Sequence, residues 1–261
     1  MPLRRSHIAR FLSFLLPLFL GALLFMPTEV MAQAINLDLG QGPTTSARLI
    51  QLTLLMTVLA LAPSILIMVT CFTRVVVVLS FLRTAIGAQQ TPPNIVLISL
   101  ALFLTFFVMQ PVFEQAWNNG MRPYMNNEID EETSFNKSIQ PFHDFMLQHT
   151  REKDLILFMD MAKIELPAKD ARPEAKREAM PLRVVIPAFM ISELRRAFEI
   201  GFLVFLPFLI IDMVIASLLM SMGMMMLPPT VISLPFKIIF FVLVDGWYLI
   251  SGSLVQSYGT G

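Results

Sequence analysis

Three ionisable side chains lie within the long apolar stretches of the C-terminal third: Asp212, Lys237 and Asp245. Asp212 comes sixteen residues before the first proline of the Pro228-Pro229 pair, and Asp245 comes sixteen residues after the second. In a straight antiparallel helical hairpin, both carboxylates would lie about 24 Å from the turn. Two such aspartates could share a proton and act as an acid–base pair, as in an intramembrane aspartyl-type enzyme.

The alternative interpretation is that each of these residues makes a buried polar contact. Bends expected at Pro207 and Pro235 would spoil the simple geometry of the hairpin, and the chain has no Gly-x-Gly-Asp motif. Lys237, about 12 Å from the turn, matches neither aspartate in depth. We therefore expect Lys237 to contact another chain or to extend its amine toward the membrane surface.

Five methionines fall within seven residues, beside Gly223: Met220, Met222, Met224, Met225 and Met226. Methionine side chains are unbranched, flexible and polarizable, so they can repack around many shapes. They could fill gaps in a membrane core. Alternatively, such a cluster beside a glycine and a Pro-Pro turn could form a deformable seal across a pore, which blocks ions and yields to a polypeptide of any sequence.

The remaining residue types give no sign of an enzyme. Cys71 is the only cysteine, and His7, His143 and His149 lack the spacing of a metal site. The chain contains no G-x-x-x-x-G-K-[ST], H-E-x-x-H or G-x-S-x-G motif. A formal net charge of zero gives no sign of a nucleic-acid partner. We predict no catalytic, metal-binding or cofactor-binding residue. If the protein moves a substrate across the membrane, the energy must come from a partner or from the proton gradient.

The elements that must position these residues are predicted to be membrane helices. Hydrophobic residues make up 56% of the chain and charged residues 15%, with a mean hydropathy of +0.69. Both proportions depart from those of a soluble domain. Pro63, like Pro207 and Pro235, is expected to kink its helix. Four predicted helices are each long enough to cross about 30 Å of hydrocarbon: 49–69, 95–113, 192–227, whose apolar run begins at Ile200, and 231–258.

Residues 1–32 have the three parts of a cleavable secretory signal peptide. A basic start precedes the apolar run 11–25, and small residues lead to a predicted cleavage between Ala32 and Gln33. The alternative is an uncleaved first membrane helix.

Residues 33–113 are predicted to form a first helical hairpin with two spans. Arg74 and Arg83 lie between these spans with no acidic residue, and short loops rich in Lys and Arg stay in the cytoplasm. The connection is therefore expected to face the cytoplasm, which agrees with an N-terminus exported by the signal peptide.

Residues 114–186 carry 23 of the 38 charged residues and are predicted to form a small periplasmic helical domain. Apolar residues from Phe135 to Phe145 recur at helical spacing, with a break or kink expected at Pro141. A second helix is indicated from Leu155 to Ala162, followed by a polar linker at 168–180. The apolar faces of this domain are predicted to form oligomer contacts. Residues 187–261 then form a second hairpin that carries the methionine-rich loop.

Three segments resemble the FliP/SctR family of type III secretion export-gate proteins, and the signal peptide fits the flagellar branch better than the injectisome branch. They are SELRRAFEIGFLVFLPFLIIDMVIASLLMSMGMMMLPPTVISLPFKIIFFVLVDGW at 192–247, PAFMISEL at 187–194 and FTRVVVVLSFLRTAIGAQQTPPN at 72–94.

This resemblance implies an all-α membrane subunit of kinked helical hairpins, with about five copies assembled into a helical, ring-like channel. It implies FliQ and FliR as sister subunits, contacts with FlhB, FlhA, the rod base and membrane lipid, and a place in the bacterial inner membrane within the flagellar basal body. The implied cargo is unfolded rod, hook and filament proteins. In the family a methionine loop lines the constriction, a role that would fall here on Met224, Met225 and Met226.

Three hypotheses follow for the function. The first is a non-enzymatic channel subunit for polypeptide export through the flagellar export gate. The second is an intramembrane aspartyl-type enzyme that uses Asp212 and Asp245, and the third is a transporter for a small solute.

Overall fold

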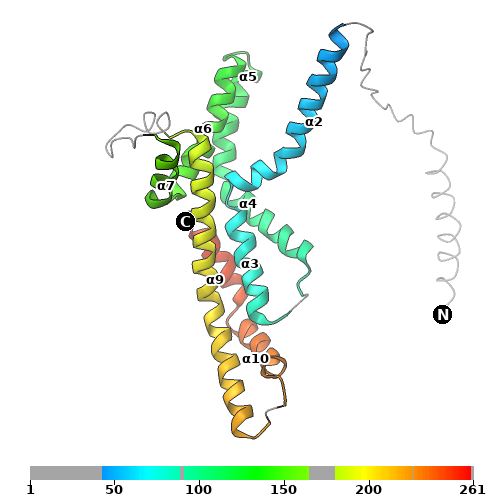
Figure 1. Cartoon of the computed structure of the whole chain (residues 1–261), viewed down its shortest axis with the longest axis vertical. Coiled ribbons are helices and arrows are strands. Elements are labelled where there is room, and N and C mark those ends of the chain that lie inside the picture. The colour runs from blue at the N-terminus through cyan, green and yellow to red at the C-terminus, as the bar shows by residue number, and fades with distance from the viewer. Residues whose placement is uncertain (1–42, 89–90, 165–179, 225, 260–261) are drawn as a thin grey trace, which may run out of the picture. The chain divides into compact units, whose positions relative to one another are not determined.

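The computed structural model describes residues 43–88, 91–164, 180–224 and 226–259 (Figure 1). Every regular element among these residues is a helix, which confirms the predicted all-α class. The predicted signal peptide, with its cleavage between Ala32 and Gln33, lies outside the described residues, as does nearly all of the linker 168–180. The elements are α2 (Pro43–Val69), α3 (Phe72–Ile86), α4 (Asn94–Ala116), the π-helix η1 (Trp117–Met121), α5 (Arg122–Met125), α6 (Glu131–His149), α7 (Glu152–Ala162), α9 (Leu182–Ser221), α10 (Pro229–Leu243) and α11 (Gly246–Gln256).

Helix α2 contains the boundary between two compact units, Met1–Met56 and Thr57–Gly261. Within the first unit, the described residues 49–56 expose large apolar side chains such as Ile50 and Leu54. The helix bends by 43° between Leu49–Leu61 and Pro63–Val69, so the kink predicted at Pro63 is confirmed.

The second unit is organised around α9, a helix of 40 residues and about 60 Å. Helix α9 packs against α3, α6, α7 and α10, while α4 packs against α3 and α6. The main apolar cluster joins α4, α6, α7 and α9, and it includes Phe145, Met159 and Phe189. A second cluster joins α3 to α4 and α11, and a third joins α3 to α9 and α10. The side-by-side course of α3 and α9 is visible in Figure 1.

The start of α9 corrects the expectation of a helix from Ser192 to Leu227. The helix begins ten residues earlier, at Leu182, and runs through both Pro187 and Pro207 before it ends at Ser221. Ser192 and Glu193 have the residue types of a helix start, but both are fully buried in the middle of α9. Ser192 contacts Asp154 of α7 and Glu193 contacts Arg74 of α3, so tertiary contacts explain these polar residues better than capping does.

The prediction of a break or kink at Pro141 is wrong as to the break, because α6 continues through this residue. Asp130 caps the helix by accepting a hydrogen bond from the Thr133 amide at 3.2 Å, and the helix is continuous to His149. Proline inside a helix costs about 3 kcal/mol because one backbone hydrogen bond is lost. Pro141 is itself buried, and Phe145 and Met146 just beyond it enter the main apolar cluster, which favours the continuous helix.

The final apolar stretch corrects the expectation of one helix over 231–258. It is divided into α10 and α11, whose axes differ by 62°. The break lies at Asp245, which has a left-handed backbone with φ of 49° and is followed by Gly246. Aspartate tolerates this conformation better than most residues, which explains why the chain turns at this position.

Among the described residues, two helical stretches are long and apolar enough to cross a membrane, Asn94–Met125 and Leu182–Ser221. The number rises to four if the bent pair around Pro63 and the pair α10–α11 each count as one span. This is consistent with a helical membrane protein and with the four predicted stretches.

Candidate functional site

The methionine-rich turn lies between α9 and α10 and has a defined backbone structure. Gly223 adopts a left-handed conformation with φ of +74°. The Gly223 amide donates to the Met220 carbonyl at 3.1 Å, and the Met224 amide donates to the Leu219 carbonyl at 2.9 Å. This pair of bonds is the Schellman arrangement that ends a helix at a left-handed glycine. The turn is therefore built by backbone groups and leaves its side chains free.

The methionine side chains of the turn are exposed in the single chain. Met226 is 99% exposed and Met224 45%, and Met220 and Met222 are also exposed. Met225 lies outside the described residues. The turn thus presents several flexible thioethers at the end of a hairpin, which suits contact with a partner or a passing chain better than filling of its own core.

The hairpin that carries the turn is braced by an ion pair between its two helices. Lys237 Nζ donates to Asp212 Oδ2 at 2.6 Å and to the Ala85 carbonyl of α3 at 3.2 Å. The Ser233 hydroxyl donates to the other carboxylate oxygen of Asp212. Asp212 and Lys237 also line a cavity of 1070 Å³ that extends to Arg83.

This ion pair corrects the expectation that Lys237 contacts another chain or extends toward the membrane surface. Depth along this hairpin cannot be counted from the prolines alone, because α9 already ends at Ser221 and α10 begins at Pro229. Counted from the helix ends, Asp212 lies nine residues before Ser221 and Lys237 lies eight residues after Pro229. The two side chains therefore share one depth, about 12–14 Å from the turn.

Asp245 does not join Asp212 in this structure. It is exposed at the break between α10 and α11, while the carboxylate of Asp212 is bound by Lys237 and Ser233. An acid–base pair of aspartates needs two carboxyl groups in contact so that they can share a proton, whereas Asp212 contacts a lysine and a hydroxyl group. The arrangement therefore does not favour the aspartyl-enzyme hypothesis.

A second polar site, centred on Arg74, was missed as a site by sequence reasoning. Arg74 Nε donates to Glu193 Oε2 at 2.9 Å, and Nη2 donates to the other oxygen of the same carboxylate. The Arg74 guanidinium carbon lies 3.8 Å from the ring centroid of Tyr258, whose hydroxyl also donates to Glu193. A further bond of 2.9 Å joins Nη1 to the Ser257 hydroxyl. The cluster thus ties α3, α9 and the C-terminal end of the described chain together.

The Arg74 cluster also corrects the expectation that Arg74 is a loop charge between two spans. Arg74 lies on α3 and both it and Glu193 are completely buried. The useful sequence signal was a single arginine inside FTRVVVVL, because a buried cation requires a buried anion. Glu193 lies 119 residues away, so no local pattern pairs the two.

Arg83 lies on the last turn of α3 rather than in a loop. Its Nη1 atom donates to the Asn94 side-chain oxygen at the start of α4 and to the Pro92 carbonyl at 3.5 Å. The bond to Asn94 joins the last turn of α3 to the start of α4. The cytoplasmic position of this connection remains a prediction.

A third polar network fastens α7 to α9. Asp154 accepts a hydrogen bond of 2.6 Å from the Ser192 hydroxyl, and Arg151 Nε and Nη2 each donate to it at 2.9 Å. Burial raises the pKa of the Asp154 carboxyl, but the hydrogen bonds from Ser192 and Arg151 outweigh this effect, and its pKa lies below 3.8. Ser192 therefore acts as a contact between helices.

His149 lies outside the predicted membrane spans and should make the stability of the folded chain sensitive to acid. Burial, followed by repulsion from Arg74 and Arg196, lowers the pKa of His149 from 6.5 to about 4. Since the folded chain disfavours the protonated ring, its stability should fall as pH drops from 6.5 toward 4. His149→Phe keeps an aromatic ring beside Phe145 and Tyr258. We expect its thermal midpoint to depend less on pH over this range than that of the wild-type chain.

The measurement is a series of thermal unfolding curves of the purified chain in detergent at pH values from 4 to 7.5. At pH 7.5 the wild-type chain and His149→Phe should differ only by the packing of one ring. An equal loss of midpoint on acidification in both proteins would contradict the assignment to His149.

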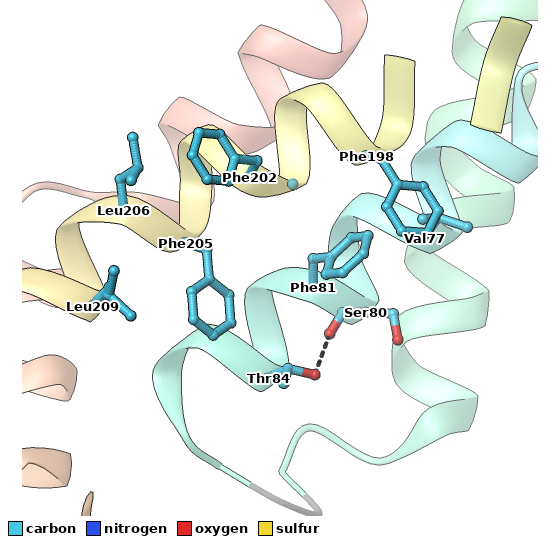
Figure 2. Close-up of a pocket in the computed structure, with 10 residues that line it drawn as sticks. Val77, Ser80, Phe81, Thr84, Phe198, Phe202, Phe205, Leu206 and Leu209 are labelled. Carbon is cyan, nitrogen blue, oxygen red and sulfur yellow. Dashed lines mark hydrogen bonds between the residues drawn. The ribbon is translucent and has the colours of Figure 1, made fainter. Parts of the chain in front are cut away.

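An apolar groove lies between α3 and α9, with a cavity volume of 460 Å³. Figure 2 shows Phe81, Phe198 and Phe205 among its walls. The ring centroids of Phe81 and Phe198 are 5.0 Å apart, with an edge-to-face geometry. The Thr84 hydroxyl donates to the Ser80 carbonyl of its own helix at 3.0 Å. These walls offer apolar contact and carry no ionisable side chain.

Within the parts of the chain that the structure describes, no group of three or more His, Cys, Asp or Glu side chains is arranged to hold a metal ion. The polar sites are instead pairs of opposite charge between helices, supplemented by hydroxyl groups. They can hold helices in place, and the methionine turn can make apolar, adaptable contacts.

Comparison with known proteins identifies the family to which this arrangement belongs. The FliP family pattern matches residues 55–254. The chain is 57% identical over 237 residues to the flagellar biosynthetic protein FliP of Caulobacter vibrioides, which covers 90% of this chain and 86% of that relative. It is 54% identical over 228 residues to the protein of the same name from Bacillus subtilis, with 87% of this chain and 100% of the relative covered. For the relative from Aquifex aeolicus the identity is 52% over 224 residues, with 86% and 91% covered.

The matched region contains the methionine-rich turn, the Asp212–Lys237 and Asp154–Ser192 contacts, and the Arg74–Glu193 pair of the Arg74 cluster. A match over this length and at these identities shows common descent of the entire helical arrangement from α3 to α10, and we conclude that the chain belongs to the FliP family of flagellar biosynthetic proteins.

Proposed function

We propose that this chain is a core subunit of the flagellar type III protein-export gate. In this proposal several copies assemble with FliQ and FliR into a channel, contacted by FlhB and FlhA, through which unfolded rod, hook and filament proteins cross the inner membrane. Membership of the FliP family supports a role in flagellar export. The observation that carries the finer proposal is the exposed methionine turn on a braced hairpin.

In the α9–α10 hairpin, polar contacts join the two helices at one level, and flexible apolar side chains lie nearer the turn. The Asp212–Lys237 pair and the Ser233 hydroxyl hold α9 and α10 together about 12–14 Å from the turn. Beyond this brace the exposed side chains are mainly methionines and other apolar residues. A ring of such tips would form a dewetted constriction that resists ions. Because thioether side chains repack easily, the same ring would yield to a polypeptide of any sequence.

The length of α9 supports an assembly of several protein chains. The helix is about 60 Å long, whereas the hydrocarbon core of a bilayer is about 30 Å thick. Large apolar residues are exposed along α9 from Ile191 to Met220, a stretch of about 44 Å. Lipid can cover only part of this face, so the remainder requires contact with neighbouring protein subunits.

The channel proposal is tested by shortening the methionines of the turn. We expect Met224, Met225 and Met226 replaced together by Ala to make vesicles that contain the assembled gate several-fold more permeable to ions and small dyes. The smaller side chains would leave a gap in the seal while export of flagellar proteins continues.

Met213→Ala provides the matched control, because Met213 is also exposed on α9 but lies outside the turn. Its permeability should equal that of the wild-type gate. An unchanged permeability of the triple variant, with normal assembly, would count against the methionine seal.

A further inference from the structure

The described methionines of the turn between α9 and α10 have exposed side chains. Met220, Met222, Met224 and Met226 are all exposed, with Met226 at 99%. By contrast, Met109, Met146 and Met159 in the main apolar cluster are completely buried. Oxidation of methionine requires contact between the thioether and the oxidant, so exposure decides which residues react. One chain therefore contains both reactive and protected methionines.

We propose that the methionine turn is a reversible oxidation site, at which hydroperoxides convert thioethers to sulfoxides and thereby open the seal. This inference rests on the proposed function of the turn as a seal.

The reaction needs no catalytic group from the protein. A lone pair of the thioether sulfur attacks one oxygen of hydrogen peroxide, the O–O bond breaks and an S–O bond forms. Sulfur loses two electrons, and the second peroxide oxygen leaves as water after it takes up the remaining proton. Reduction by a methionine sulfoxide reductase, with a dithiol as electron donor, restores the thioether.

The geometry of the turn predicts a change of polarity without unfolding. Its helix-ending hydrogen bonds join backbone amides and carbonyls, from Gly223 to Met220 and from Met224 to Leu219. No sulfur atom takes part in these bonds, so sulfoxide formation leaves them intact. It does convert flexible apolar tips into polar ones. Since a hydrophobic constriction closes by excluding water, polar tips should admit water and ions.

The first experiment measures which methionines react. Vesicles that contain the full chain with its co-expressed sister subunits are treated with hydrogen peroxide, and the addition of oxygen to each methionine peptide is followed by mass spectrometry. We expect the turn to react at least about tenfold faster than Met109, Met146 and Met159, in line with their exposure. A turn that reacts no faster than these buried residues would overturn the proposal.

The second experiment measures permeability to a small dye in the same vesicles. Peroxide should raise dye leakage several-fold in the wild-type gate, and a methionine sulfoxide reductase should reverse the increase. A variant with all five methionines of the turn replaced by Leu keeps apolar side chains of similar volume. Peroxide should not change its leakage, because leucine cannot be oxidised.

The outcomes separate this inference from the proposed function. If the triple Ala variant leaks but the oxidised wild-type gate does not, the seal stands and the oxidation switch is wrong. If neither leaks although sulfoxides have formed, both proposals are wrong. Peroxide-induced leakage that persists in the five-Leu variant would assign it to another residue and would also overturn the inference.

Discussion

Arg74→Met should destabilise the folded chain by about 3–5 kcal/mol, because it leaves the carboxylate of Glu193 buried without its cation. Both side chains are completely inaccessible, and two hydrogen bonds join the guanidinium to the carboxylate. The substitution also removes the contact of Arg74 with the Tyr258 ring and its bond to Ser257. The remaining hydroxyl of Tyr258 cannot replace a full positive charge.

The stability is measured as the free energy of unfolding of the purified chain in detergent, from denaturant or thermal curves. The double variant Arg74→Met with Glu193→Leu should recover most of the loss, since exchange of both charges for apolar groups is often neutral. A double variant as unstable as the sum of the two single variants would contradict a direct pairing of these side chains.

The exposed pair Arg195–Glu199 on α9 provides a matched control. The Arg195 Nε and Glu199 Oε1 atoms are 2.8 Å apart, but the two side chains are 55% and 58% exposed. Water solvates both charges after the pair is broken, so Arg195→Met should cost less than about 1 kcal/mol. Comparable losses from Arg74→Met and Arg195→Met would show that burial does not determine the effect.

Gly120→Ala should destabilise the chain by about 1–3 kcal/mol through overpacking. A Cβ atom at Gly120 would lie 2.0 Å from the Ser138 hydroxyl oxygen and 2.8 Å from backbone atoms of Ser134 and Ser138. The backbone of α6 cannot yield as a flexible side chain can, so α6 and η1 must move apart. The shift would also weaken the bond of 3.2 Å from the Ser134 hydroxyl to the Gly120 carbonyl.

Gly252→Ala is the control for this prediction. Gly252 lies within α11, and none of the described atoms beyond its own helix lies within 4 Å of the position of an added Cβ. Alanine should leave the thermal midpoint unchanged or raise it, because glycine inside a helix costs about 0.5–1 kcal/mol relative to alanine. If both substitutions have equal effects, the close approach of η1 and α6 is not the cause.

Local features of the sequence were sufficient to predict much of the architecture. The long apolar stretches and the prolines predicted helices, the bend at Pro63 and the turn at Pro228-Pro229. Apolar spacing from Leu155 to Ala162 predicted α7. The resemblance of three segments to the FliP/SctR family is confirmed by the family match over 55–254. These features depend on composition and on neighbours within a few turns of helix, which a sequence displays directly.

Where the helices begin and end depended on contacts between distant residues. Ser192 and Glu193 resemble a helix start, but they are partners of Asp154 and Arg74 in the middle of α9. Pro141 has the type of a helix breaker, but apolar packing keeps α6 continuous. In each of these cases burial and tertiary hydrogen bonds outweigh a local preference that is worth only a few kcal/mol.

By itself, the sequence determined that this chain is helical, rich in membrane-type stretches and marked by an unusual group of methionines before a double proline. Only the tertiary structure decided that Lys237 pairs with Asp212, that Arg74 is buried against Glu193 and that the methionines of the turn are exposed. The physical reason is that a charge in an apolar segment requires a partner, but its type does not specify which one. The choice depends on which helix ends meet in space, and residues 25 and 119 positions apart become neighbours only after packing.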